Sequence, residues 1–241
     1  MLYAPSNSST ILEVSKAPTD ELIVIDQGNG TVVVVVPDNA TGNVTIKDSI
    51  LENGTLANIQ IQSSSDYTVT LENVTITNTG DSINNTNTAI NMIGSSGTKL
   101  NIVGGNFENL GLAGKDGGVI YATNTAIAIS SNAKFSGNKA KVAGAIYAGS
   151  GSSLTLNGGE FAKTNNEIYL ANGNTLTMAG AAKVMSVVTV ADTGATPVVS
   201  ITAQLTQTEN LNIKFDSSKY ALATKLITVA KDSNKQAVVS A

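Results

Sequence analysis

The chain has 241 residues, of which 41% are hydrophobic and only 13% are charged, and its formal net charge is −4. It contains no Cys, His, Trp or Arg. These absences exclude zinc sites of the usual kind, thiol nucleophiles, imidazole bases and bidentate phosphate clamps. The net negative charge and the scattering of the 14 lysines along the chain argue against nucleic acid as a partner. We expect no cofactor and no metal site.

The chain also lacks the pattern of a membrane-spanning segment. Its most apolar run, the valines of residues 31–36, is much shorter than the about 20 apolar residues that a helix needs to span a bilayer. Residues 1–14 do not read as a signal peptide, because a basic start and a continuous apolar stretch are missing. If the protein is exported, we expect the export signal and any anchor to lie outside this stretch.

The first third of the chain contains short strand-like runs. ELIVID, TVVVVVP, NVTIKD and LANIQIQ are followed by YTVTLENVTI from Tyr67 and TAINMIG from Thr88. Clusters of Gly, Asn, Ser and Asp separate these runs, and no run has the apolar spacing of a helix. The sequence therefore predicts an all-β protein.

A repeat of about 27 residues becomes clear after residue 98. Its best copies are KLNIVGGNFENL from Lys99, AIAISSNAKFSGN from Ala126 and SLTLNGGEFAKTN from Ser153. Phe107, Phe135 and Phe161 recur in one register. Such a unit cannot bury its apolar face alone, but stacked units share a core in which like residues contact like residues. We expect the three phenylalanines to form an internal stack.

A second strand recurs between these copies. GGVIYA begins at Gly117, AGAIYA at Ala143 and NEIYLA at Asn166, which places Tyr121, Tyr147 and Tyr169 in register. The preceding isoleucine of each copy should point inward, so the alternation of a strand directs the tyrosines outward.

These registers favour a right-handed parallel β-helix over a sandwich or barrel of hairpins, which needs no strict register between distant segments. We expect an N-terminal cap over residues 1–30, coils over residues 31–185 and closing strands or a cap over residues 186–241. Capping strands matter because an uncovered solenoid end exposes unpaired strand edges.

Two short motifs resemble those of a known family. Phe135 with Asn138 matches F-x-x-N, while Gly117–Ile120 and Ala143–Ile146 match G-G-A-I with one change each. Residues 99–180 thus resemble the repeats of polymorphic outer-membrane proteins and similar bacterial surface proteins. The resemblance implies a β-helical passenger or stalk exposed on a cell surface, often engaged in adhesion. It supplies no catalytic residues.

The candidate ligand-binding residues are Tyr121, Tyr147 and Tyr169. On adjacent coils they would form an aromatic strip with hydroxyl groups, suited to sugars or to an aromatic-rich protein contact. The alternative is that the strip only stabilises an exposed sheet. Two longer turns, at residues 79–88 and 111–118, are candidate binding loops with Asp81, Lys115 and Asp116 as charged members. Their alternative is that they are ordinary solvated loops.

The sequence therefore favours a non-enzymatic, extracellular or cell-surface structural or adhesive module whose partner is a glycan or an extracellular protein. The competing interpretation is a carbohydrate-active β-helix, either a polysaccharide-binding module or an enzyme resembling lyases or hydrolases. Such an enzyme needs closely spaced carboxylates. No two Asp residues here lie within five residues of each other. The oligomeric state is not predicted.

Overall fold

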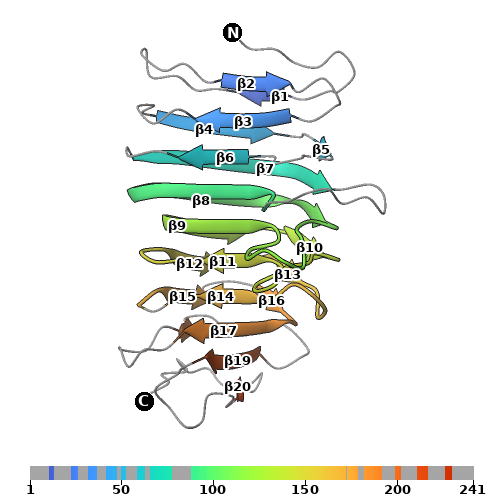
Figure 1. Ribbon diagram of the computed structural model, residues 1–241, viewed down its shortest axis with the longest axis vertical. Helices are drawn as coiled ribbons and strands as arrows, with labels where there is room; N and C mark the ends of the chain where they lie inside the picture. Colours follow the sequence, from blue (N-terminus) through green and yellow to red (C-terminus); the bar gives the residue numbers. More distant parts are fainter. Residues whose placement is uncertain are drawn as a thin grey trace.

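The computed structural model describes residues 11–13, 23–26, 32–36, 42–47, 50–52, 59–62, 66–77, 88–171, 173–178, 182–191, 199–201, 211–216 and 226–229. All regular structure in these ranges is β-strand, and none of it is helix. The 20 strands follow one another along a single axis as the stacked coils of a parallel β-solenoid (Figure 1). The predicted all-β solenoid is therefore confirmed.

Each coil passes through three faces, which we name by their order along the chain. The first face consists of β2 (Ile23–Asp26), β3 (Val32–Val36), β6 (Ile59–Gln62), the start of β8 (Ile90–Glu108), the start of β9 (Ile120–Ser130), β11 (Ile146–Ala148), β14 (Ile168–Leu170), β17 (Val187–Ala191), β19 (Leu211–Asp216) and β20 (Leu226–Val229).

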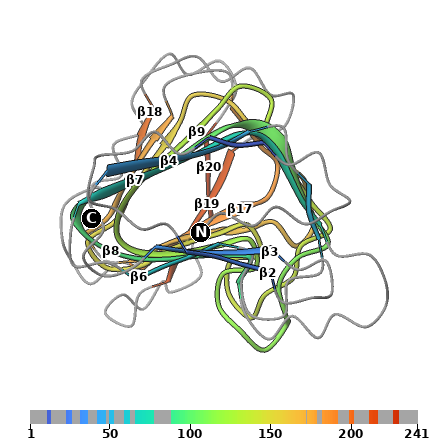
Figure 2. The ribbon, with the colours of Figure 1, turned by 90° about the horizontal axis from the view of Figure 1, so that it is seen from above.

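The second face consists of β1 (Ile11–Glu13), β4 (Gly42–Lys47), the start of β7 (Tyr67–Thr77), the middle of β8, the rest of β9, β12 (Ser153–Leu156), β15 (Thr175–Met178) and β18 (Val199–Ile201). The third face consists of β5 (Ile50–Glu52), the ends of β7 and β8, β10 (Lys134–Ser136), β13 (Glu160–Phe161) and β16 (Lys183–Val184). Viewed along the axis, the faces of successive coils superpose around one common interior (Figure 2).

Neighbouring coils pair in parallel, and the only antiparallel pairs among the described strands lie near the two ends. These pairs are β1 with β4, β2 with β3, and β19 with β20. An antiparallel strand laid on the last parallel one changes the pairing geometry at the end of the stack, so the edge is a poorer template for another parallel coil. Capping strands were expected at both ends.

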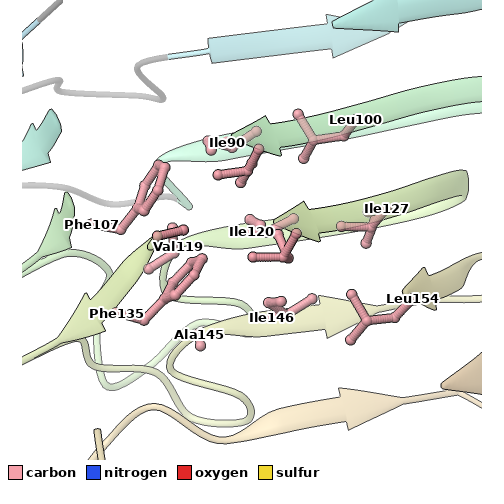
Figure 3. Packing of buried hydrophobic residues seen from close by; sticks show 14 of the residues in the cluster. Ile90, Leu100, Phe107, Val119, Ile120, Ile127, Phe135, Ala145, Ile146 and Leu154 are labelled. Carbon is pink, nitrogen blue, oxygen red and sulfur yellow. The ribbon is translucent and has the colours of Figure 1, made fainter. Parts of the chain in front are cut away.

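The core consists of columns of like side chains. Ile90, Ile120, Ile146 and Ile168 stack beneath the first face, and Leu100, Ile127, Leu154 and Leu176 stack beneath the second. Figure 3 shows the upper members of both columns pointing into the same interior. All eight side chains are buried. Full burial of an aliphatic side chain of this size stabilises the fold by about 1.5–3 kcal/mol.

The phenylalanines of the third face form the predicted internal stack. The ring centroids of Phe107 and Phe135 are 4.9 Å apart, and those of Phe135 and Phe161 are 4.4 Å apart, with interplanar angles of 15° and 5°. All three rings are buried. The separation follows from the strand spacing of about 4.8 Å, which brings identical side chains within stacking distance.

The turn from the third face to the first explains the G-G-A-I motif. Gly117, Ala143 and Asn165 occupy equivalent positions with φ of 71°, 63° and 57°, so each begins the motif in the left-handed region. At the second position of the first two turns a side chain is excluded, because a Cβ on Gly118 would overlap the carbonyl of Gly144 below it and a Cβ on Gly144 would overlap the carbonyl of Asn165. The motif thus permits two turns to stack at close range.

The asparagine of F-x-x-N closes the same turn from inside. Asn138 is fully buried, and its Oδ1 accepts a hydrogen bond from the backbone N–H of Leu110 at 3.0 Å. Its Nδ2 donates to the carbonyl of Phe107 at 3.0 Å and to Oδ1 of Asn166 at 2.8 Å. One amide therefore links three successive coils, because its partners lie on the coils before and after its own, and its own polar atoms are satisfied as burial requires.

The close stacking of the turns predicts that Gly144→Ala is destabilising. The added Cβ would overlap the carbonyl oxygen of Asn165, so two coils must separate. We expect a loss of about 1–3 kcal/mol, as in other overpacked interiors, measured as a fall in the denaturation midpoint. Gly114→Ala is the matched control, because nothing lies within 4 Å of a Cβ at that position. An equal effect of both substitutions would contradict this role of Gly144.

The buried amide gives a second prediction. Asn138→Ala should lower the free energy of unfolding by roughly 2–4 kcal/mol, because it leaves buried partners of the amide without a hydrogen bond. Thermal and urea denaturation would measure the loss. Asn157→Ala, at an exposed position on the next repeat, should change stability little. A destabilisation no larger than that of the control would show that the amide is not needed to hold the turn.

Candidate functional site

Tyr121, Tyr147 and Tyr169 form a continuous ladder on the outer side of the first face. Backbone pairing places them directly in register, on β9, β11 and β14. The ring centroids of Tyr121 and Tyr147 are 4.9 Å apart with planes 8° from parallel, and those of Tyr147 and Tyr169 are 4.7 Å apart at 14°. We call these three side chains the tyrosine ladder.

The ladder points outward, as the alternation of the strands predicts. Each tyrosine is half-buried, whereas the isoleucine before it is fully buried. The hydroxyl group therefore lies at the outer end of each ring. Asn91 precedes the ladder in the same register and Thr189 follows it, so the aromatic part of the row spans three coils.

Stacking decides which part of the ladder is available to a partner. Three rings have six faces, and the two stacked pairs turn four of these faces toward another tyrosine. The ladder therefore presents ring edges and hydroxyl groups, and a sugar ring could stack flat only at its two ends. Within the part of the chain that the structure describes, the hydroxyls of Tyr121 and Tyr147 make no hydrogen bond.

The turns between the third and first faces project beside the ladder. Figure 2 shows them extending beyond the corner where the first face begins. A Cβ on Gly117 would lie 3.1 Å from the Cβ atoms of both Tyr121 and Tyr147, so this turn lies directly against the base of the ladder. We call the segments 109–118, 137–144 and 162–167 together the turn ridge.

The turn ridge is where the coils differ in length. Twelve residues separate Phe107 from Ile120, ten separate Phe135 from Ile146 and six separate Phe161 from Ile168. The corresponding connections at the other two corners of these coils have six or seven residues, except that nine separate Ile90 from Leu100, where the register shifts between Ile93 and Thr98. The repeat is thus regular on its faces, and its departures from 27 residues arise mainly at the ridge.

The three charged residues predicted for the binding loops differ in where they lie. Lys115 is exposed on the ridge. Asp116 is half-buried, pairs through its backbone with Val142 on the next coil, and has one buried carboxylate oxygen, Oδ1, without a hydrogen-bond partner. Asp81 lies outside the described residues, as does most of the turn at residues 79–88. Among the described loop residues, Asp116 lies close enough to the tyrosine ladder for its charge to act on Tyr147.

Sequence reasoning missed two further charged residues of the ridge. Lys139 and Lys141 are exposed on the turn below Lys115, and the backbone N–H of Lys141 donates to the carbonyl of Lys115 at 2.7 Å. The signal was present in the sequence, because KDGGVIYA from Lys115 aligns without a gap with KVAGAIYA from Lys141. Aligning N-K-A-K with the segment before Gly117 would have shown three lysines on adjacent coils.

The surroundings of the central tyrosine favour its neutral form. Burial raises the pKa of Tyr147 above its ordinary value of 10.0, and the neighbouring Tyr169, Tyr121 and Asp116 raise it further because phenolate and carboxylate charges repel. The hydroxyl of Tyr147 therefore remains a hydrogen-bond donor well above neutral pH.

Neither a metal centre nor a membrane span is found in the described parts of the chain. No three His, Cys, Asp or Glu side chains gather there in a way that could hold a metal ion. The described residues include no helix that is long and apolar enough to cross a membrane.

The raised pKa of Tyr147 makes a pH prediction. The phenolate absorbance is measured against pH for the wild type and for a Tyr147→Phe variant. The difference between the two curves reports Tyr147, and it should titrate above pH 10. Because the unfolded chain loses this proton first, the stability that the neutral hydroxyl contributes is present below pH 10 and is lost as the pH rises through the folded pKa. A component that titrates at or below pH 10 would contradict this account of the ladder.

Comparison with known proteins gives no relative for the chain, since no family model, curated protein or solved structure matches it.

Proposed function

We propose that this chain is a non-enzymatic, extracellular or cell-surface module that binds a glycan or an extracellular protein through the tyrosine ladder. The observation that carries the proposal is the ladder itself. Three aromatic side chains are held in one line by backbone pairing, and they direct their hydroxyl ends away from the core.

Rigidity is what makes such a ladder suitable for recognition. Each tyrosine is fixed by the strand that carries it and by the ring next to it, so little side-chain freedom remains to be lost when a partner binds. Tyrosine also offers an apolar edge and a polar tip in one group, which suits the contact of a protein with sugars or with another protein.

The repeat motifs support the proposed location. F-x-x-N at Phe135 and the two G-G-A-I copies resemble those of polymorphic outer-membrane proteins, in which such coils form a surface-exposed passenger or stalk. Both motifs have a structural role in this chain, because Asn138 closes a turn and Gly144 allows two turns to approach each other closely. The motifs therefore support a scaffold role, and the ladder supplies the proposed contact.

The ladder's role is tested by a binding screen against glycans and matrix proteins. The variant Tyr121→Phe, Tyr147→Phe, Tyr169→Phe keeps the stacked rings and removes the hydroxyls, so we expect near wild-type stability with at least about tenfold weaker binding. The corresponding triple Ala variant should lose binding. Its free energy of unfolding should also fall by about 0.5–1.5 kcal/mol for each stacked pair that is removed.

A control for general surface effects is Thr155→Ala with Thr177→Ala, because these half-buried residues occupy the outer side of the second face. We expect this variant to bind like the wild type. If the wild type and both tyrosine variants bind every glycan and matrix protein equally, the ladder only stabilises the sheet and the proposed function is wrong.

A further inference from the structure

The turn ridge differs in charge from the rest of the molecule. Its three segments carry the four lysines Lys115, Lys139, Lys141 and Lys163 against the two carboxylates of Asp116 and Glu167, while the whole chain has a net charge of −4. All four lysines are exposed, whereas both carboxylates are half-buried. The solvent-facing charge of the ridge is therefore positive.

These ammonium groups are not neutralised by the protein. Within the described residues, the ion pair that the structure contains is Lys47 with Glu72 on the second face, and none of the four ridge lysines lies within 4.0 Å of a carboxylate. Lysines that are exposed and unpaired keep their charge available to an anion in solution.

Three of the lysines lie beside the tyrosine ladder on two stacked turns. The N–H of Lys141 donates to the carbonyl of Lys115, and the N–H of Lys139 donates to the carbonyl of Leu110 at 2.8 Å. Lys115 precedes Gly117 by two residues, which span at most about 7 Å, and Gly117 touches the base of Tyr121 and Tyr147. A lysine side chain at this distance can reach a ligand that contacts the ladder.

We propose that the turn ridge and the tyrosine ladder together form a binding surface for a linear acidic polysaccharide that lies along the solenoid axis. This inference rests on the proposed function and narrows its ligand to a glycan with carboxylate or sulfate groups. The hydroxyls of the ladder bond sugar hydroxyls or anionic oxygens. Lys115, Lys139 and Lys141 attract the charged groups from the side.

The geometry favours a polysaccharide over other polyanions. Nucleic acids bind such surfaces by stacking bases on exposed aromatic faces, and here most ring faces are covered by neighbouring tyrosines. A row of hydroxyls with the axial repeat of a β-sheet instead matches a hydroxyl-rich polymer, whose groups also recur at short, regular intervals. The lysines then select an acidic polymer over a neutral one.

The proposal is tested by measuring binding to immobilised polygalacturonate, dextran sulfate and neutral dextran at about 0.15 M salt, where charges interact over about 8 Å. We expect the wild type to bind one or both acidic polymers and not dextran. A preference between polygalacturonate and dextran sulfate identifies the anionic group as carboxylate or sulfate. Binding of the variant Lys115→Gln, Lys139→Gln, Lys141→Gln should fall by about tenfold or more.

A matched control separates the ridge from net charge. The variant Lys99→Gln, Lys134→Gln, Lys183→Gln removes the same charge from three exposed lysines on the second and third faces. It should bind like the wild type. Equal losses in the two lysine variants would overturn the proposal, because binding would then follow net charge and not the ridge.

Two further outcomes would also overturn it. Binding of polyglutamate in place of both acidic polysaccharides would point to an acidic protein as the partner. Binding of dextran that depends on the tyrosines and not on Lys115, Lys139 and Lys141 would leave the proposed function standing and refute the acidic ligand. If no ligand depends on the tyrosines either, the proposed function fails as well.

Discussion

The parallel hydrogen bonding between successive coils governs nearly everything else in this molecule. It fixes neighbouring strands about 4.8 Å apart and in register, so a residue on one coil lies directly over its counterpart on the next. The same constraint yields the isoleucine columns, the phenylalanine stack inside and the tyrosine ladder outside. Packing and surface chemistry therefore share one cause.

The constraint is hardest to meet at the corners, and the short motifs serve that purpose. Backbones of adjacent turns approach so closely that Gly118 and Gly144 leave no space for a Cβ. Asn138 satisfies the polar groups that the turn buries. A motif of this kind indicates a way of turning the chain, and it includes none of the ladder tyrosines.

The fold was predictable because its signal is periodic. Leu100, Ile127 and Leu154 are evenly spaced, and the phenylalanines are nearly so. Stacked coils require this pattern. The outward direction of the tyrosines followed from strand alternation. The register of Lys115 and Lys141 could have been found in the same way, because each lies five residues before the isoleucine of its strand. The position of Lys139 could not, because it lies in the part of the turns that differs in length. Nor could the sequence tell that stacking covers most tyrosine faces.

The unequal turns of the ridge separate the parts of the molecule that can change from those that cannot. Every residue added to a face would shift a whole row of side chains between core and solvent. The ridge shortens from twelve residues to six over three coils without disturbing the columns beside it. Differences in length are thus accommodated mainly at the corner that adjoins the tyrosine ladder, and once more at the register shift between Ile93 and Thr98. The length of the turns beside the ladder can therefore change while the columns and the ladder keep their register.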